Sequence, residues 1–226
     1  MPSAAVPDRP ALTLYTESTW TSPWVFHAMI ALEEKQLPYK IEVVPMPIPA
    51  PTKTSLQGKA VLGTVPILVH GDAWISESLA ISEYLEEVFP APGHAALLPG
   101  PAVERARARQ IMSFLRTSLH ALREARPTTS VFGRPITKPM SDKARAEAAE
   151  LERAALAWVL GADGEVRKDG GALFGAWSVA DADLALALMR LIANQDPLDR
   201  RLTAYALAQF DRKSVRRFVA HLPTTR

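Results

Sequence analysis

The pattern of apolar residues changes near residue 90, and this change limits what the chain can fold into. Before it, short apolar and β-branched runs alternate with stretches of helical periodicity. After it, the apolar residues recur only at helical spacing. A segment rich in Pro, Gly and Ala, residues 90–101, separates the two patterns. We therefore expect a mixed α/β unit over residues 1–89, a linker, and an all-helical unit over residues 102–226.

The first unit is predicted to alternate strands and helices. Ser22-Pro23 suits a helix start, because serine caps helix ends and proline is tolerated in the first turn. Gly71-Asp72 indicates the turn of a β-hairpin. The expected strands are residues 12–16, 41–44, 65–69 and 73–76, and the expected helices are residues 22–37 and 77–89.

Proline constrains two places in this unit. Four prolines at alternate positions over residues 45–51 indicate an extended loop, since proline lacks an N–H and fixes φ. Pro66 lies inside the third expected strand, where it would remove a ladder hydrogen bond. We therefore expect Pro66 to begin that strand or to form a special bend.

The second unit is predicted to be helical throughout. A stripe of apolar residues at spacings of four, four and three runs along residues 104–124. Ser178 and Asp181 have the spacing of a capping box, directly before the most apolar stretch, residues 184–193. The other expected helices are residues 141–160, capped by Ser141, residues 198–209 and residues 211–222, with a Gly-rich loop over residues 161–175.

Composition excludes several classes of protein. The chain of 226 residues has no cysteine, so it offers no disulfide, no zinc ribbon and no thiol nucleophile of its own. Its five histidines show no metal-ligand spacing, and no Gly-rich phosphate loop is present, so we expect no metal and no nucleotide cofactor. Residues 184–193 are far shorter than the roughly 20 apolar residues of a membrane span, and residues 1–11 show no secretory signal. We therefore expect a cytoplasmic protein with no membrane association.

The charge balance is nearly neutral but uneven along the chain. Lys and Arg number 26 and Asp and Glu number 24, a net charge of +2. Residues 1–90 hold five of the basic and ten of the acidic side chains, so this part is acidic and the remainder is basic. The basic part lacks interleaved aromatic residues and any nucleic-acid-binding motif, so we expect no nucleic-acid partner.

Three motifs resemble those of the cytosolic glutathione transferase superfamily. They are Val65-Pro66 within VPIL, Glu77-Ser78 within SESLAISEYL, and the capping box within FGAWSVADADLAL. With the Ser-Pro-Trp helix start and the helical second half, the resemblance covers nearly the whole chain. It implies an N-terminal thioredoxin-like domain, an all-helical C-terminal domain that supplies the electrophile pocket, and a homodimer in which the small domain of one subunit meets the helical domain of the other.

A finer resemblance comes from the first helix of the second unit. Leu115-Arg116, Arg123-Glu124 and the run from Arg126 to Thr128 resemble a bacterial serine-type branch of this superfamily. That branch is related to peroxide and disulfide metabolism. The resemblance therefore allows glutathione-dependent peroxidase or disulfide-reductase activity as well as conjugation.

The resemblance implies that Ser22 activates the sulfur of glutathione. A thiol with a pKa of about 8.5 is only about 3% thiolate at pH 7, and lowering the pKa by two units gives roughly 75%. A hydroxyl that donates to the sulfur at a helix N-terminus is a reasonable source of that shift. From spacing alone, however, Ser22 is a helix cap, and Thr19 and Thr21 are close enough to share or take over the role.

Other residues are implied to bind glutathione. The residue before the proline at the family's cis-proline corner pairs with the cysteinyl backbone, and a Glu-Ser pair binds the γ-glutamyl end. Lysine in the proline-rich loop could reach the glycyl carboxylate. The candidates are Trp24, Lys53, Val65, Pro66, Glu77 and Ser78.

The helical unit offers fewer candidates. Arginines interleaved on an amphipathic helix usually form its solvated face, but some of them could line the electrophile pocket or a dimer surface. The candidates for the pocket are Leu119, Arg123 and Arg126. We assign folding rather than chemistry to Ser178 and Asp181, because the family uses this capping box to start its buried helix.

Two functions remain open from the sequence. The first is a glutathione transferase that activates the glutathione thiolate for attack on an electrophile. The second is a non-catalytic module of the same fold that binds a protein partner through its helices, since a fold does not fix a function. The intact Ser-Pro-Trp, Val-Pro and Glu-Ser sequences favour the enzyme.

Overall fold

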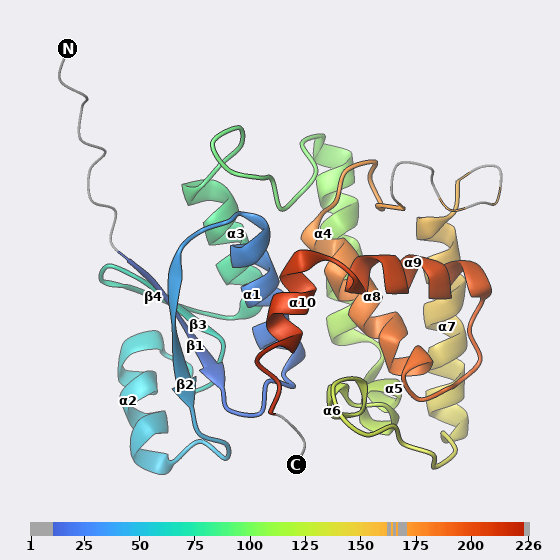
Figure 1. The fold of residues 1–226 in the computed structure, drawn as a ribbon, viewed down its shortest axis with the longest axis horizontal. Coiled ribbons are helices and arrows are strands. Elements are labelled where there is room, and N and C mark those ends of the chain that lie inside the picture. The colour runs from blue at the N-terminus through green and yellow to red at the C-terminus, as the bar shows by residue number, and fades with distance from the viewer. Residues whose placement is uncertain (1–10, 162–163, 165, 167–170, 224–226) are drawn as a thin grey trace.

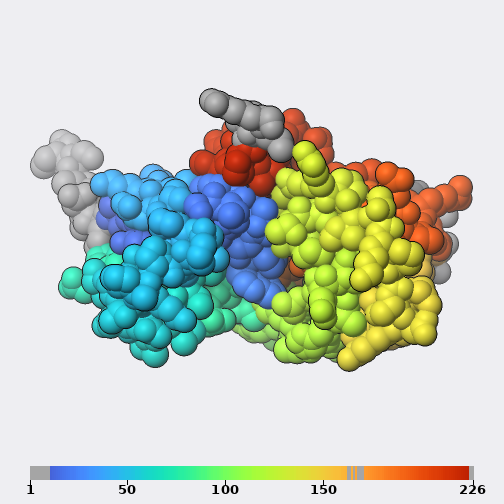
Figure 2. Space-filling view, turned by 90° about the horizontal axis from the view of Figure 1, so that it is seen from below, coloured from blue at the N-terminus to red at the C-terminus, as the bar shows by residue number. Residues whose placement is uncertain are grey.

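A computed structural model describes residues 11–161, 164, 166 and 171–223. The chain forms a small α/β domain followed by a larger helical domain, which lie side by side (Figures 1 and 2). Residues 1–10, for which we predict no secretory signal, and seven of the fifteen residues of the loop predicted over residues 161–175 lie outside the described residues. No helix in the described part of the chain is long and apolar enough to cross a membrane.

The α/β domain is built on one four-stranded sheet with the order β2-β1-β3-β4. β1 runs parallel to β2 and antiparallel to β3, and β3 pairs antiparallel with β4. This mixed sheet with helices on its faces is a thioredoxin-like arrangement, as predicted (Figure 1). Its elements are β1 (Leu12–Glu17), α1 (Pro23–Glu34), β2 (Tyr39–Val44), α2 (Ala50–Ala60), β3 (Ile67–His70), β4 (Ala73–Ser76) and α3 (Ser78–Val88).

The proline-rich segment differs from the prediction of an extended loop. The chain is irregular up to Pro49, but α2 begins at Ala50, with Pro51 in its first turn. Proline is tolerated there because the first N–H groups of a helix have no partner within the helix. The loop prediction therefore holds for residues 45–49 and is wrong at residues 50 and 51.

The helical domain contains seven helices in its described part. The cap at Ser141 is confirmed, since its hydroxyl accepts a hydrogen bond from the Ala144 N–H at 3.2 Å. The capping box of Ser178 and Asp181 at the start of α8 is also confirmed. The helices are α4 (Ala102–Thr117), α5 (His120–Ala125), α6 (Thr128–Val131), α7 (Asp142–Val159), α8 (Val179–Ile192), α9 (Arg200–Phe210) and α10 (Lys213–Val219).

The long helix predicted over residues 104–124 is broken in two. α4 ends at Thr117, and the backbone leaves helical geometry at Ser118 and Leu119 before α5 begins. A carboxylate from α7 stabilises the new helix start, because the Leu122 N–H donates to Glu147 at 2.9 Å. The break therefore depends on a contact with a helix that lies later in the chain.

The cores of the two domains meet along α1. One core cluster fills the helical domain, and a second fills the space between the sheet, α1 and α3. The second cluster also takes in Ala182 and Leu186 from α8 and Val215 and Phe218 from α10. This apolar contact holds the N-terminus of α1 against the helical domain, where the cavities described below lie.

Candidate functional site

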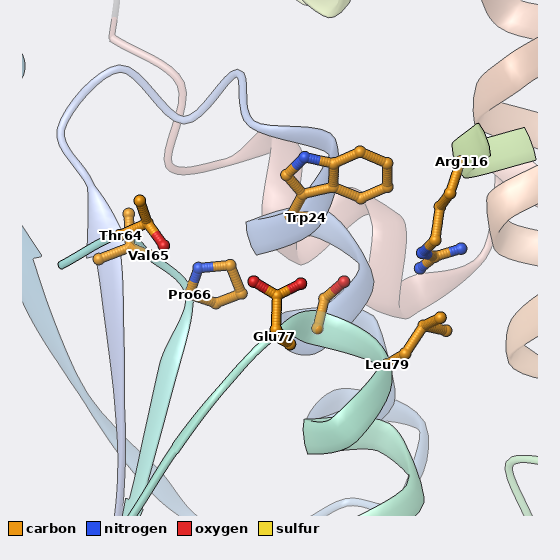
Figure 3. Close-up of a pocket in the computed structure, with 8 residues that line it drawn as sticks. Trp24, Thr64, Val65, Pro66, Glu77, Leu79 and Arg116 are labelled. Atoms are coloured by element: carbon orange, nitrogen blue, oxygen red, sulfur yellow. The ribbon is translucent and has the colours of Figure 1, made fainter. Parts of the chain in front are cut away.

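A cavity of about 370 Å³ lies between the two domains. In Figure 3, Trp24 of α1 lies above it, the segment before β3 lies to the left, the start of α3 lies below, and Arg116 of α4 enters from the side of the helical domain. Five of the six predicted glutathione-binding residues line it. The lining residues are Trp24, Thr64, Val65, Pro66, Glu77, Ser78, Leu79 and Arg116.

Lys53 is the predicted residue that does not line this cavity. It is an exposed residue in the first turn of α2 rather than in a loop. Because the proline-rich segment becomes helical at Ala50, the position of Lys53 follows the helix. Arg116 is the cationic side chain among the residues that line this cavity.

The Val65-Pro66 peptide bond is cis, as the motif predicts. Both residues line the cavity, and Pro66 lies one position before β3 begins at Ile67. The strand predicted over residues 65–69 thus starts two residues later. Its proline lies outside the hydrogen-bonded ladder, where the missing N–H costs no pairing.

Glu77 and Ser78 form the junction between β4 and α3. Glu77 has φ of +69°, a backbone conformation that is uncommon for a residue with a side chain and that concentrates at functional sites. Ser78 is buried at the start of α3, where backbone N–H groups and the helix dipole favour an anion. The Glu77 carboxylate extends into the space below Trp24 (Figure 3). This junction can bind an ammonium group through Glu77 and a carboxylate through the helix start.

Ser22 caps α1, as its position predicts. Its hydroxyl oxygen accepts hydrogen bonds from the N–H groups of Trp24 at 3.3 Å and Val25 at 3.4 Å. A hydroxyl that accepts these bonds still has its own proton to donate. Ser22 is not among the residues that line the cavity, but it lies two positions before Trp24 at the same helix start. Capping and donation to a ligand are therefore compatible.

The buried carboxylate of Glu17 holds the segment that leads to Ser22. It accepts hydrogen bonds from four backbone N–H groups, including those of Thr21 at 2.7 Å and Ser22 at 2.9 Å. The Thr19 hydroxyl also donates to Glu17, at 2.5 Å, and lies 3.0 Å from the Thr21 hydroxyl. Because the Thr19 proton goes to Glu17, Thr21 is the donor in the bond between the two threonines, and Ser22 is the one of the three hydroxyls whose proton has no partner among the described residues.

A buried polar network holds Arg116 at the cavity. Asp183 of α8 accepts from Arg116 at 2.5 Å and lies 2.8 Å from Nδ1 of His27. His27 in turn lies 3.1 Å from the Ser82 hydroxyl of α3. Burial would raise the pKa of Asp183, but the charges of Arg116 and His27 and their hydrogen bonds outweigh it and hold the pKa at about 2. The network links α1, α3, α4 and α8 across the domain interface.

The three residues predicted for the electrophile pocket have different positions. Leu119 and Arg123 line a small cavity next to Trp24, together with Arg116 and other residues. Arg126 lines none of the cavities described here. It is buried and forms an ion pair with Asp196 through two hydrogen bonds, at 2.5 and 2.9 Å. This pair stabilises the fold and occupies the guanidinium group.

Several residues of the site were missing from the sequence prediction. Thr64 and Leu79 adjoin predicted residues, so only their neighbours indicated them. Glu17 gave no signal, because its partners are backbone N–H groups. The sequence analysis named Arg116 only as part of the Leu115-Arg116 motif that resembles the bacterial serine-type branch. Arg190 interrupts the most apolar stretch of the chain, and that interruption was a usable signal.

Comparison with known proteins relates this chain to glutathione S-transferases. The family model described as glutathione S-transferase, N-terminal domain, matches residues 21–88. The probable glutathione S-transferase GSTU6 of Oryza sativa subsp. japonica is 30% identical over 171 residues, which are 74% of this chain and 66% of that protein. Glutathione S-transferase U13 of Arabidopsis thaliana is 34% identical over 91 residues, 40% of this chain and 39% of that protein. The chain thus spans between about two fifths and two thirds of the length of these relatives.

Solved structures give a longer match. A glutathione transferase homolog from Burkholderia GL BGR1, with bound glutathione, has a TM-score of 0.71 and 31% sequence identity, and the match covers 93% of this chain and 97% of that one. The family model described as glutathione S-transferase, C-terminal domain, matches residues 102–223, which are more than half of the chain. This chain belongs to the glutathione S-transferase family.

Proposed function

We propose that the protein is an enzyme that binds glutathione and activates its thiolate for attack on an electrophile. The observation that carries the proposal is the convergence on one cavity of Trp24, the cis Val65-Pro66 pair and the Glu77-Ser78 helix start. A cavity of about 370 Å³ is within the size range of small-molecule sites. The bound glutathione of the Burkholderia homolog, whose structure matches 93% of this chain, supports the same ligand here.

Each group of residues has a part in this proposal. The γ-glutamyl end lies at Glu77 and Ser78, and the cysteinyl backbone pairs with Val65. The sulfur then lies at the start of α1, where Ser22 donates its proton to the thiolate. In this arrangement the residues of 1–89 bind glutathione, and the helices of 102–226 face the electrophile.

The reaction needs no group from the protein other than hydrogen-bond donors. The thiolate attacks the electrophilic atom, a sulfur bond forms, and the leaving group departs with the electron pair of the broken bond. With an aryl halide the sulfur forms a C–S bond and halide leaves, and with a mixed disulfide it forms a new S–S bond and a thiolate leaves. With an organic hydroperoxide the sulfur takes the terminal OH as a sulfenic acid and the alkoxide leaves and takes up a proton; a second glutathione then converts the sulfenic acid to glutathione disulfide and water. We propose these three substrate classes, with roles in detoxification and in the response to oxidative stress, for a cytoplasmic homodimer.

Two measurements test the proposal. Calorimetry with 10 mM glutathione, about tenfold above a dissociation constant of about 1 mM, should detect binding. Steady-state kinetics with glutathione and one member of each substrate class should then identify the reaction. Binding without turnover of any class would favour the non-catalytic module, and no binding at 10 mM would refute the proposal.

A further inference from the structure

Two more cavities adjoin the start of α1 on the side of the helical domain. One has a volume of about 360 Å³ and the other of about 30 Å³. Both are lined by Pro23 and Trp24, the first two residues of α1, and by Arg123 and Arg190. Because Ser22 immediately precedes them, this space lies where an electrophile would meet the thiolate.

Arg190 is a buried charge without a carboxylate partner. It is 6% exposed on α8, the most apolar helix of the chain. Within the described part of the chain, its side chain donates one hydrogen bond, to the backbone oxygen of Arg126 at 2.7 Å, and pairs with no carboxylate. A buried guanidinium has five N–H donors, and leaving its charge unpaired is costly. Arg190 is therefore ready to bind an anion.

Arg123 also lacks a carboxylate partner among the described residues. It donates to the backbone oxygen of Arg116 at 2.7 Å and lies over the Trp24 ring at 5.3 Å, with no ion pair in the described part of the chain. Burial and the charge of Arg116 lower the pKa of Arg123, while burial and the charge of Arg123 lower the pKa of Arg190 to about 10. Both side chains stay protonated at neutral pH, so two positive charges face one space without compensation.

The acidic groups nearby do not provide that compensation. Asp183 lines the small cavity, but Arg116 and His27 already bind it. Glu124 lines the larger cavity as an exposed residue, and it forms no ion pair with Arg123 or Arg190. By contrast, the buried Arg126 on the same stretch of chain is fully paired with Asp196. A buried arginine close by in the sequence therefore has a carboxylate partner, whereas the two arginines that line these cavities have none among the described residues.

We propose that this space binds a carboxylate on the electrophile, so that the enzyme prefers anionic electrophiles over neutral ones of the same shape. The proposal rests on the proposed function, because it concerns the second substrate of that reaction. A carboxylate offers two acceptor oxygens to the two guanidinium groups, and charge-assisted bonds of this kind are the strong ones. The apolar part of the electrophile would pack on Trp24 and Pro23, which line both cavities.

Two glutathione conjugates that differ by one charge test the proposal. One carries a 4-carboxy-2-nitrophenyl group on its sulfur, and the other carries a 4-carbamoyl-2-nitrophenyl group of nearly the same size. Calorimetry should show that the carboxylate conjugate binds the native protein about tenfold more tightly, the effect of one charged hydrogen bond. Arg123→Gln should remove most of that preference and leave the affinities for the carbamoyl conjugate and for glutathione within about twofold of those of the native protein.

A matched control separates this effect from a general loss of positive charge. Arg107 is an exposed arginine of α4 that lines none of the cavities around Trp24, so Arg107→Gln should change neither affinity. Arg190→Gln provides a second variant from another helix, and it should lower the same preference. Agreement between the two site variants would assign the effect to the shared space.

Three outcomes would overturn the inference while the proposed function stands. They are equal affinities of the native protein for the two conjugates, an equal loss of both affinities in Arg123→Gln, and binding of glutathione without binding of either conjugate. A lower affinity of Arg123→Gln for glutathione itself would also overturn it, because Arg123 would then belong to the glutathione half of the site. Absence of glutathione binding by the native protein would instead refute the proposed function.

Discussion

Replacing Ser22 by alanine should raise the pKa of the thiol of bound glutathione without abolishing glutathione binding. The Ser22 hydroxyl already accepts two backbone N–H bonds, at 3.3 and 3.4 Å, and these polarise it and strengthen its own donor. A hydrogen bond to a charged group is worth about 1.5–3 kcal/mol. Since one pKa unit corresponds to about 1.4 kcal/mol, the substitution should raise the thiol pKa by about 1–2 units.

This shift has a calculable effect on the rate at each pH. If the native site lowers the thiol pKa from about 8.5 to about 6.5, the variant should have a value of about 7.5–8.5. The thiolate fraction at pH 7 then falls from roughly 75% to between about 24% and 3%, which is a rate loss of about 3- to 25-fold. At pH 9 both proteins are mostly thiolate, and the variant thiolate is the more basic nucleophile. The rate difference should therefore nearly disappear at pH 9.

The assay is the turnover number with saturating glutathione and an aryl halide, measured from pH 5.5 to 9.5. Loss of the cap should also lower the free energy of unfolding by about 1 kcal/mol. Ser141→Ala is the matched control, because it removes the confirmed cap of α7 far from the cavity and should leave the pH profile unchanged. A Ser22→Ala rate loss that is the same at every pH would refute activation by this hydroxyl, and Thr21→Val would be the next variant to test.

Three further predictions follow from named contacts. Glu17→Gln should lower the free energy of unfolding by about 3 kcal/mol in urea, because an amide cannot accept all of the loop N–H bonds, whereas the exposed Glu42→Gln should change it little. Asp183→Asn should be less stable than the native protein by about 2–3 kcal/mol at pH 7. Because the folded pKa of Asp183 is about 2, that difference should be complete above about pH 4 and disappear as the pH falls through 2; a difference that persists at pH 2 would contradict it. Ser78→Ala should raise the KM for glutathione and leave turnover nearly unchanged, and an unchanged KM would mean that Ser78 only begins a helix.

The sequence predicted those parts of the fold that depend on strong local patterns. The four strands, the hairpin turn, the cap at Ser22 and the capping box at Ser178 each depend on a short segment, so each could be predicted from a few neighbouring residues. α2 was missed because only Leu56 and Ala60 of its residues are buried, which gives almost no apolar periodicity. Its first turn also contains a proline, which the pattern treated as a helix breaker.

Other features depend on contacts between distant residues. The break between α4 and α5 is stabilised by Glu147 of α7, and no spacing within residues 104–124 shows that contact. Arg126 was predicted for the pocket, but Asp196, 70 residues away, binds it instead. Arg123 and Arg126 are three residues apart, and nothing in the surrounding sequence distinguishes their roles. Only the positions of the carboxylates separate the unpaired arginine from the structural one.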